Sequence, residues 1–189
     1  MGEQPLIPQT DVAVAKERWP SDLHIEQKLG KDVTTDDHND FRKYIGRERE
    51  LAIHGDKQSD DYLLKLQSGI NNSFAVRYLE ESRMKYPQSV VMFVRKNNDN
   101  SIVGNCITLI EKQQDTIIGV STHIGLGWEY QKMGIGSQLL AKHIAALKKE
   151  RVHTMFLSVW EGSKRLVDKL RLQYDVDPER ANGIKISLT

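Results

Sequence analysis

The sequence predicts a mixed α/β domain built on a mostly antiparallel sheet with helices on both faces. Segments with the two-residue apolar period of strands alternate with segments that have the helical period of about 3.6 residues. Short turn-forming stretches join several strand segments directly, as antiparallel hairpins require. A single strand-helix-strand crossover between residues 116 and 159 makes its two strands parallel, so we expect one parallel pair within the sheet.

The first part of the chain is expected to form one strand and two helices. Leu23–Leu29 alternates apolar and polar residues, which is typical of a half-buried strand. Threonines and aspartates at 34–37 are N-cap candidates for a helix that runs to about Ile53. A second helix should begin near the aspartates 60 and 61 and continue to about Met84, before Pro87. Apolar residues recur at helical spacing in both helices: Phe41, Tyr44, Ile45 and Ala52 in the first, and Leu63, Leu66, Ile70 and Phe74 in the second.

Strands dominate the next part, and the crossover follows. Apolar strand segments at 90–95, 102–110 and 116–127 are separated by the turn signals at 97–100 and 113–115. The clearest helix covers 137–150, where Leu140, Ile144 and Leu147 share one face. A strand at 154–159, a helix at 163–172 and a last strand at 183–188 complete the expected order.

Composition limits the class of protein. The chain has 189 residues, which fits one domain, and we expect that domain at 21–189 behind an N-terminal arm at 1–20. No run of about 18 apolar residues occurs, so we expect no membrane span. Cys106 is the only cysteine, which excludes an internal disulfide and a cysteine-based zinc site. We expect a cytoplasmic protein without a bound metal, and Cys106 as a small core residue.

The formal net charge of +1 argues against a dedicated nucleic-acid binder, which needs an excess of lysine and arginine. The balance is uneven along the chain. Residues 1–61 hold 9 basic and 14 acidic side chains, whereas residues 62–189 hold 18 basic and 12 acidic ones. The basic part could face a small polyanion or could be an ordinary solvated surface, and the charge count leaves both readings open.

The loop that leads into the clearest helix is the most informative segment. Gly134 and Gly136 permit a tight backbone turn, and the helix start beside them adds unpaired N–H donors. Such a loop suits a pyrophosphate, although a plain turn into a helix would use the same residues. The spacing excludes the Walker phosphate loop, and Leu139 stands where the dinucleotide-binding fingerprint needs its third glycine or alanine.

The loop sequence QKMGIG at 131–136 fits the pattern Gln/Arg-x-x-Gly-x-Gly/Ala. Together with the strand before it, the amphipathic helix after it and the strand TMFLSV, it resembles the acyl-CoA-binding core of the GNAT superfamily of N-acetyltransferases, over about Ile102 to Leu170. The resemblance implies that the two parallel strands splay apart and that acetyl-CoA lies in the gap. It also implies which residues bind the co-substrate: Leu126, Gly127 and Trp128 along the pantetheine, and Gln131, Lys132, Met133, Gly134, Ile135, Gly136 and Ser137 at the pyrophosphate.

The implied activity is transfer of an acetyl group from acetyl-CoA to a primary amine. An ammonium group must first lose a proton, and His123 lies in the strand that lines the acceptor side in this family. We therefore take His123 as the candidate base, with Glu111 and Glu129 as further candidates. A bulge is expected in this strand, so alternation alone leaves the face of His123 open.

The family often places an acid tyrosine in the helix after the last core strand, and this chain departs from that pattern. The corresponding position holds Leu170 or Val167, depending on the alignment frame. Tyr174 is the nearest candidate acid, and solvent is the alternative donor. Two other functions stay open: a non-catalytic acyl-CoA-binding regulatory module, and an acetyltransferase acting on a tRNA or ribosomal target. The amine acceptor and the oligomeric state, a homodimer included, also stay open.

Overall fold

The computed structural model describes residues 19–54, 62–158, 161–177 and 183–188. Apart from Trp19 and Pro20, the expected arm at 1–20 lies outside the described residues. The elements run in the order β1 (Leu23–Leu29), α1 (Thr35–His54), α2 (Tyr62–Met84), β2 (Val90–Lys96), β3 (Ile102–Gln113), β4 (Thr116–Leu126), α3 (Ile135–Lys149), β5 (Thr154–Ser158), α4 (Glu161–Lys169), β6 (Tyr174–Asp177) and β7 (Gly183–Ser187). Two short 3-10 turns, Gly30–Asp32 and Trp128–Tyr130, complete the list.

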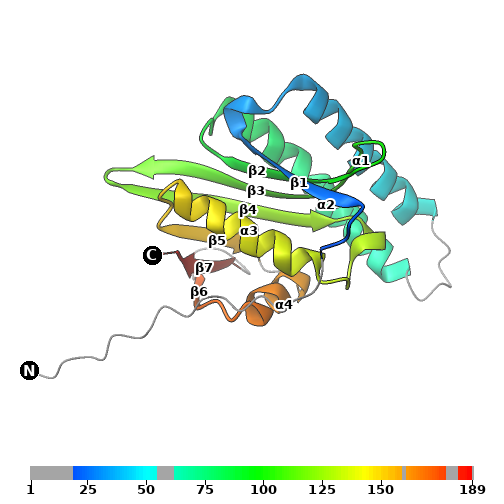
Figure 1. Ribbon diagram of the computed structural model, residues 1–189. Coiled ribbons are helices and arrows are strands. Elements are labelled where there is room, and N and C mark those ends of the chain that lie inside the picture. The colour runs from blue at the N-terminus through cyan, green and yellow to red at the C-terminus, as the bar shows by residue number, and fades with distance from the viewer. Residues whose placement is uncertain (1–18, 55–61, 159–160, 178–182, 189) are drawn as a thin grey trace, which may run out of the picture.

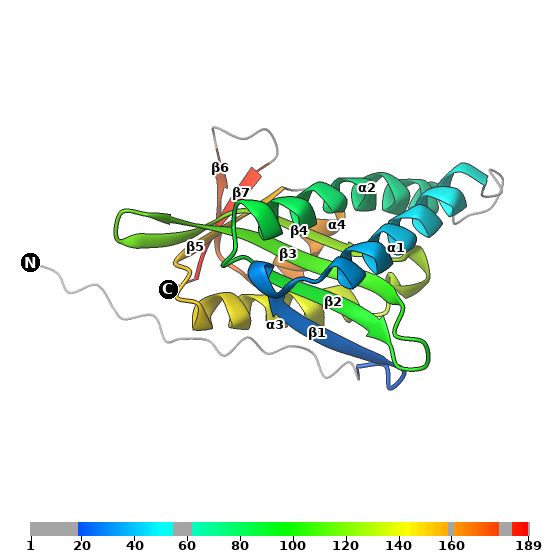
Figure 2. The same cartoon turned by 90° about the horizontal axis from the view of Figure 1, so that it is seen from above.

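The strands form one sheet in the order β1-β2-β3-β4-β5-β7-β6. The β4–β5 pair is parallel and the other pairs are antiparallel, which confirms the predicted fold class. Helices α1 and α2 cover one face of the sheet, and α3 covers the opposite face (Figure 1; Figure 2). Helix α4 lies close to the start of α3, since Leu166 of α4 is near Gly136.

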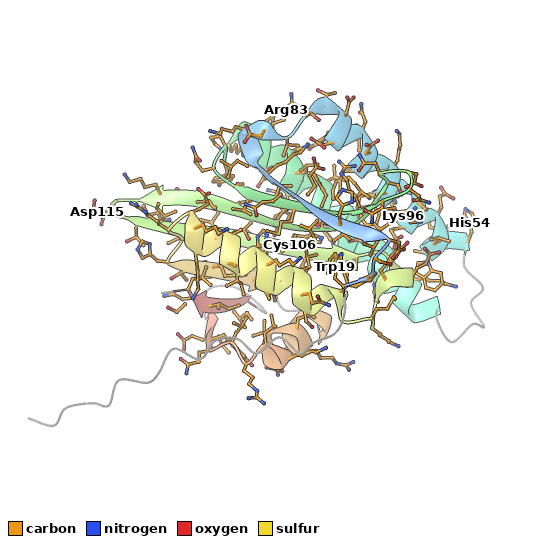
Figure 3. The ribbon with its side chains drawn as sticks, viewed as in Figure 1. Trp19, His54, Arg83, Lys96, Cys106 and Asp115 are labelled. Atoms are coloured by element: carbon orange, nitrogen blue, oxygen red, sulfur yellow. The ribbon has the colours of Figure 1, made fainter. Side chains whose placement is uncertain are left out.

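Two apolar layers, one on each face, hold the helices to the sheet. The α1/α2 layer contains Phe41, Leu79, Phe93 and Ile107, and the α3 layer contains Leu139, Leu140, Leu147 and Met155. Cys106 lies between the sheet and α3 (Figure 3). It is fully buried, and burial raises the pKa of its thiol, so its predicted place in the core is confirmed. Ile70 and Phe74 of α2 are 49% and 57% exposed, because α2 packs through a neighbouring stripe that includes Ala75 and Leu79.

The structure adds one strand to those expected from the sequence and shifts several boundaries, most clearly those of α3 and α4. Strand β6, which was not expected, has only four residues, two of them aspartates, and it is stabilised by pairing with β7. Helix α3 begins at Ile135, because Gly134 adopts the left-handed conformation and caps it. Helix α4 runs from 161 to 169 instead of 163 to 172, and Arg171, at a φ of 51°, is left-handed just beyond its end.

A buried ion-pair network ties the start of α1 to the edge of the sheet. The Arg95 guanidinium of β2 lies 2.8 Å from Asp37 and 2.6 Å from Glu26, and Lys28 of β1 lies 2.7 Å from Asp37. Burial alone would raise the pKa of Asp37, but hydrogen bonds from Lys28 and Thr34 hold it below its usual value. The network fixes the position of α1, which contributes to the candidate site.

Candidate active site

The loop before α3 presents a row of backbone donors. Lys132 and Gly134 have φ angles of 62° and 77°, so both are left-handed and the backbone curls around its own N–H groups. Within the described chain, the N–H groups of residues 132–137 have no hydrogen-bond acceptor. Such a concave row of amides at a helix start is an anion-binding arrangement. The loop therefore has the geometry that a pyrophosphate needs.

The loop is anchored to the rest of the fold by its first residues. The N–H of Gly127 donates to the Val103 carbonyl at 2.8 Å, and the N–H of Trp128 donates to the Glu48 carboxylate at 3.2 Å. The side-chain amide of Gln131 donates to the Leu126 carbonyl at 3.2 Å. These bonds hold the donors of the loop in place, while the pairing of 126–128 with pantetheine stays a prediction.

The edge of β4 beside this loop separates from β5. The pairs Ile118–Thr154, Gly119–Met155 and Thr122–Leu157 join the two strands. Beyond Thr122, the described part of β5 offers no further pair to residues 123–125, which pair with β3. A strand edge of this kind, next to a loop with a row of free N–H groups, suits a ligand with phosphates at one end and amides along its length.

A β-bulge in β4 decides where His123 points. The partners of β4 on β3 shift register between Leu109 and Ile110, which leaves Val120 as the extra residue. Gly119 faces the α3 side, since a Cβ there would contact Thr108 and Met155. Strict alternation from Gly119 would also direct His123 to the α3 side. The bulge reverses this phase, so His123 faces α1 and α2.

His123 is held as a neutral imidazole. Its ring centroid lies 5.6 Å from that of Tyr78 on α2, and the rings are tilted by 43°. Its Nε2 atom is buried and has no hydrogen-bond partner in the described structure. Burial lowers the pKa of His123 to about 4. The imidazole is therefore uncharged at neutral pH and has a nitrogen available for a substrate proton.

Tyr78 connects α2 to the bulged part of β4. Its hydroxyl lies 2.6 Å from the Ser121 hydroxyl in a partly buried hydrogen bond. Ser121 directly precedes Thr122, the last β4 residue that pairs with the described residues of β5. A tyrosine and a histidine from two different elements are thus brought together where β4 and β5 part.

A cluster of buried polar side chains lies next to this part of β4, and its residues were not predicted from the sequence. Tyr44, Glu48, Asn72 and Asn105 are each at most 2% exposed. Asn72 and Asn105 lie directly over Gly125, where a Cβ would come within 2.0 Å of Asn72 Oδ1 and 3.2 Å of Asn105 Nδ2. In the described structure, neither polar atom of the Asn105 side chain has a partner. One signal was available, because Asn105 interrupts the otherwise apolar stretch at 102–110, whereas Glu48 lies in a charged run that gives no such signal.

The other candidates lie away from the β4–β5 separation. Tyr174 is on the edge strand β6, with β7 and β5 between it and β4, and its hydroxyl lies 3.5 Å from Asp168. Glu111 and Glu129 are exposed. Glu111 lies in the outer part of the β3–β4 hairpin, whose tip carries Asp115 (Figure 3). The structure therefore groups His123 with Tyr78 and does not bring Tyr174 to the same place.

The α4 positions where the family carries its tyrosine are apolar core positions. Val167 is fully buried and Leu170 is 5% exposed. Leu166, one residue earlier, packs near Gly136 and towards Leu126, at 3.3 Å from where a Gly136 Cβ would lie. Helix α4 thus presents aliphatic side chains to the loop and to the core.

Over the described ranges, no group of three or more histidine, cysteine, aspartate or glutamate side chains is placed to hold a metal ion. None of the described helices is long and apolar enough to cross a membrane.

Comparison with known proteins identifies the fold. No family model and no curated protein sequence matches the chain. Solved structures do match: an acetyltransferase of the GNAT family from Staphylococcus aureus, at 12% identity and a TM-score of 0.53, covers 88% of this chain and 100% of its own. A Salmonella typhimurium protein solved with its cofactor acetyl-CoA is 15% identical, with a TM-score of 0.53, and the match covers 89% of this chain and 95% of that one. Ribosomal-protein-S5-alanine acetyltransferase from Vibrio fischeri is 17% identical, with a TM-score of 0.53, and the match covers 86% of this chain and 90% of that one. The chain therefore has the GNAT fold, as the loop motif indicated.

Proposed function

We propose that this protein is an acetyl-CoA-dependent N-acetyltransferase that acetylates a primary amine on a small molecule, a peptide N-terminus or a lysine side chain. One observation carries the proposal: the unpaired N–H groups of residues 132–137 open α3 beside the part of β4, residues 123–125, that makes no pair with the described part of β5. Acetyl-CoA combines a pyrophosphate with an extended amide arm, so both features would be used by one ligand. The fold shared with acetyltransferases supports this reading.

The chemistry assigned to this chain is proton removal from the amine. An amine such as lysine has a pKa of about 10.4 and must be deprotonated before it attacks a thioester. His123 is neutral and has an unpartnered Nε2 on the α1/α2 side, so we assign it as the proton acceptor. Because its pKa is about 4, the imidazole would hold this proton briefly and pass it on, as a relay does.

A non-catalytic acyl-CoA-binding module is the second candidate, favoured by the buried aliphatic side chains of Val167 and Leu170 at the family's tyrosine positions. We also propose that the protein is cytoplasmic, and cell fractionation would test this. A ribosomal protein N-terminus and a tRNA belong in the acceptor panel beside small amines.

The test is incubation of the purified protein with acetyl-CoA and a panel of amines, with thiol release as the readout. Sustained release with at least one amine supports the enzyme, and tight acetyl-CoA binding without turnover supports the module. His123→Ala should lower kcat about 100-fold or more if the imidazole is the base.

The loop is tested by Gly134→Asp, which combines a left-handed position with a carboxylate beside the donors. We expect CoA affinity, measured by isothermal titration calorimetry, to fall more than about tenfold. The matched control is Gly46→Asp, at an exposed position on α1 with nothing within 4 Å of an added Cβ. Unchanged affinity in Gly134→Asp would mean that the loop has only a structural role.

A further inference from the structure

We propose that Tyr78, on α2, is the proton donor to the departing CoA thiolate and takes the place of the tyrosine that α4 lacks. The inference rests on the proposed function and deepens it by assigning the acid. It follows from contacts of this chain that sequence spacing cannot show, because Tyr78 and Ser121 are 43 residues apart.

The hydroxyl of Tyr78 is held at a defined point. It lies 2.6 Å from Ser121 Oγ, and either hydroxyl can be the donor of this bond. When Ser121 donates, the phenolic hydrogen is free to point elsewhere. The contact is only partly buried, so water can exchange a proton with the pair.

That point coincides with the separation of β4 and β5. Ser121 follows the bulged residue Val120 and precedes Thr122, which makes the last pair with the described part of β5. About four strand residues, roughly 13 Å, separate Thr122 from Leu126 beside the phosphate-binding loop. A co-substrate with its pyrophosphate on the loop and its arm along β4 would bring its reactive end towards Ser121 and Tyr78.

Other tyrosines are less suitable. Among the side chains that the structure describes, Tyr78 is the tyrosine whose hydroxyl hydrogen-bonds to β4. Tyr44 is buried, and burial raises the pKa of its hydroxyl well above the usual value, so it would release a proton poorly. Tyr174 hydrogen-bonds to Asp168 at the far edge of the sheet.

The ammonium first loses one proton through His123 to water, which leaves a neutral amine. The amine nitrogen forms a bond to the thioester carbonyl carbon, and the nitrogen, cationic after this attack, loses a second proton to His123. The C–S bond breaks with its electron pair remaining on sulfur, and the sulfur takes the phenolic proton of Tyr78. The second proton passes from His123 through Ser121 or water to the Tyr78 oxygen. The net products are the acetylated amine, CoA thiol and one proton released to water.

The experiment compares Tyr78→Phe with Tyr174→Phe and Ser121→Ala in steady-state assays on the best amine from the panel. We expect Tyr78→Phe to lower kcat about 100-fold with the KM for acetyl-CoA changed by less than about twofold. Ser121→Ala should give a smaller loss of kcat, and Tyr174→Phe should match the wild type. The pH profile of kcat should also lose its alkaline limb in Tyr78→Phe, which a purely structural role would not cause.

The outcomes separate this inference from the proposed function. Wild-type protein without turnover on any amine overturns both. Wild-type turnover with a Tyr78→Phe kcat within threefold of it, or an unchanged pH profile, overturns the role of Tyr78 alone. A kcat loss confined to Tyr174→Phe would transfer the acid role to Tyr174. Thermal unfolding of each variant shows whether a loss of activity is a loss of fold. If Tyr78→Phe does not fold, Ser121→Ala tests the Tyr78–Ser121 hydrogen bond from the β4 side.

Discussion

Lowering the pH from 7 to 5 should destabilise this protein through His143 and His123, whose pKa values are lowered by burial of the imidazole. His143 of α3 is fully buried, and its Nε2 lies 2.7 Å from the Thr108 hydroxyl, which in turn lies 2.9 Å from the Thr122 hydroxyl. Its Nδ1 has no partner in the described structure. Burial lowers the pKa of His143 to about 3 and that of His123 to about 4.

Proton linkage gives the sign and the size of this change in the free energy of unfolding. An unfolded histidine has a pKa of about 6.5, so at pH 5 the unfolded chain binds protons at His123 and His143 that the folded protein excludes, and the lowered pKa of His38 acts in the same direction. The stability is complete above pH 6.5 and falls as the pH drops towards the folded pKa values. His123 and His143 should each remove about 2 kcal/mol from the free energy of unfolding between pH 7 and pH 5. The lowered pKa of Asp37 acts only at lower pH, where the unfolded carboxyl begins to bind protons.

Urea unfolding at pH 7 and pH 5 measures this difference. His143→Gln should lose about half of the pH dependence, because the proton that folded His143 excludes is gone. Thr108→Val is the matched control: it removes the hydroxyl that contacts His143 but keeps the imidazole, so stability should fall at both pH values while the difference persists. Equal wild-type stability at pH 5 and pH 7, or a wild-type pH dependence in His143→Gln, would refute the reasoning.

Two further predictions concern stability. Asp37→Asn should lower the free energy of unfolding by about 3 kcal/mol in urea titrations, since it leaves a buried guanidinium short of a partner. Asp40→Asn, at the more exposed rim of the same network, should cost less than about 1 kcal/mol, and equal costs would contradict the burial argument. Gly134→Ala should destabilise by about 1 kcal/mol because its φ is 77°, whereas Gly136→Ala, inside the helix with its Cβ 3.3 Å from a flexible leucine, should be close to neutral; calorimetric melting would show whether the two differ.

The elements that local pattern specifies were predicted well. The strand at Leu23–Leu29 was predicted residue by residue, because alternation of a half-buried strand is visible in seven residues. The loop before α3 was found from two glycines, whose conformational freedom is itself a local property. Strand β6 was missed, because its short acidic sequence has little strand propensity of its own and depends on β7.

In the candidate site, too, some features follow from the local sequence and others depend on tertiary packing. The sequence by itself determined the fold class, the one parallel strand pair and the glycine-containing loop before α3, since each depends on residues close together in the chain. Only the tertiary structure decided that His123 faces α1 and α2, because one bulged residue reverses the alternation of β4. It also decided that Tyr78 and Asn105 reach the same region from α2 and β3, because contacts between distant segments are set by packing and not by spacing in the sequence.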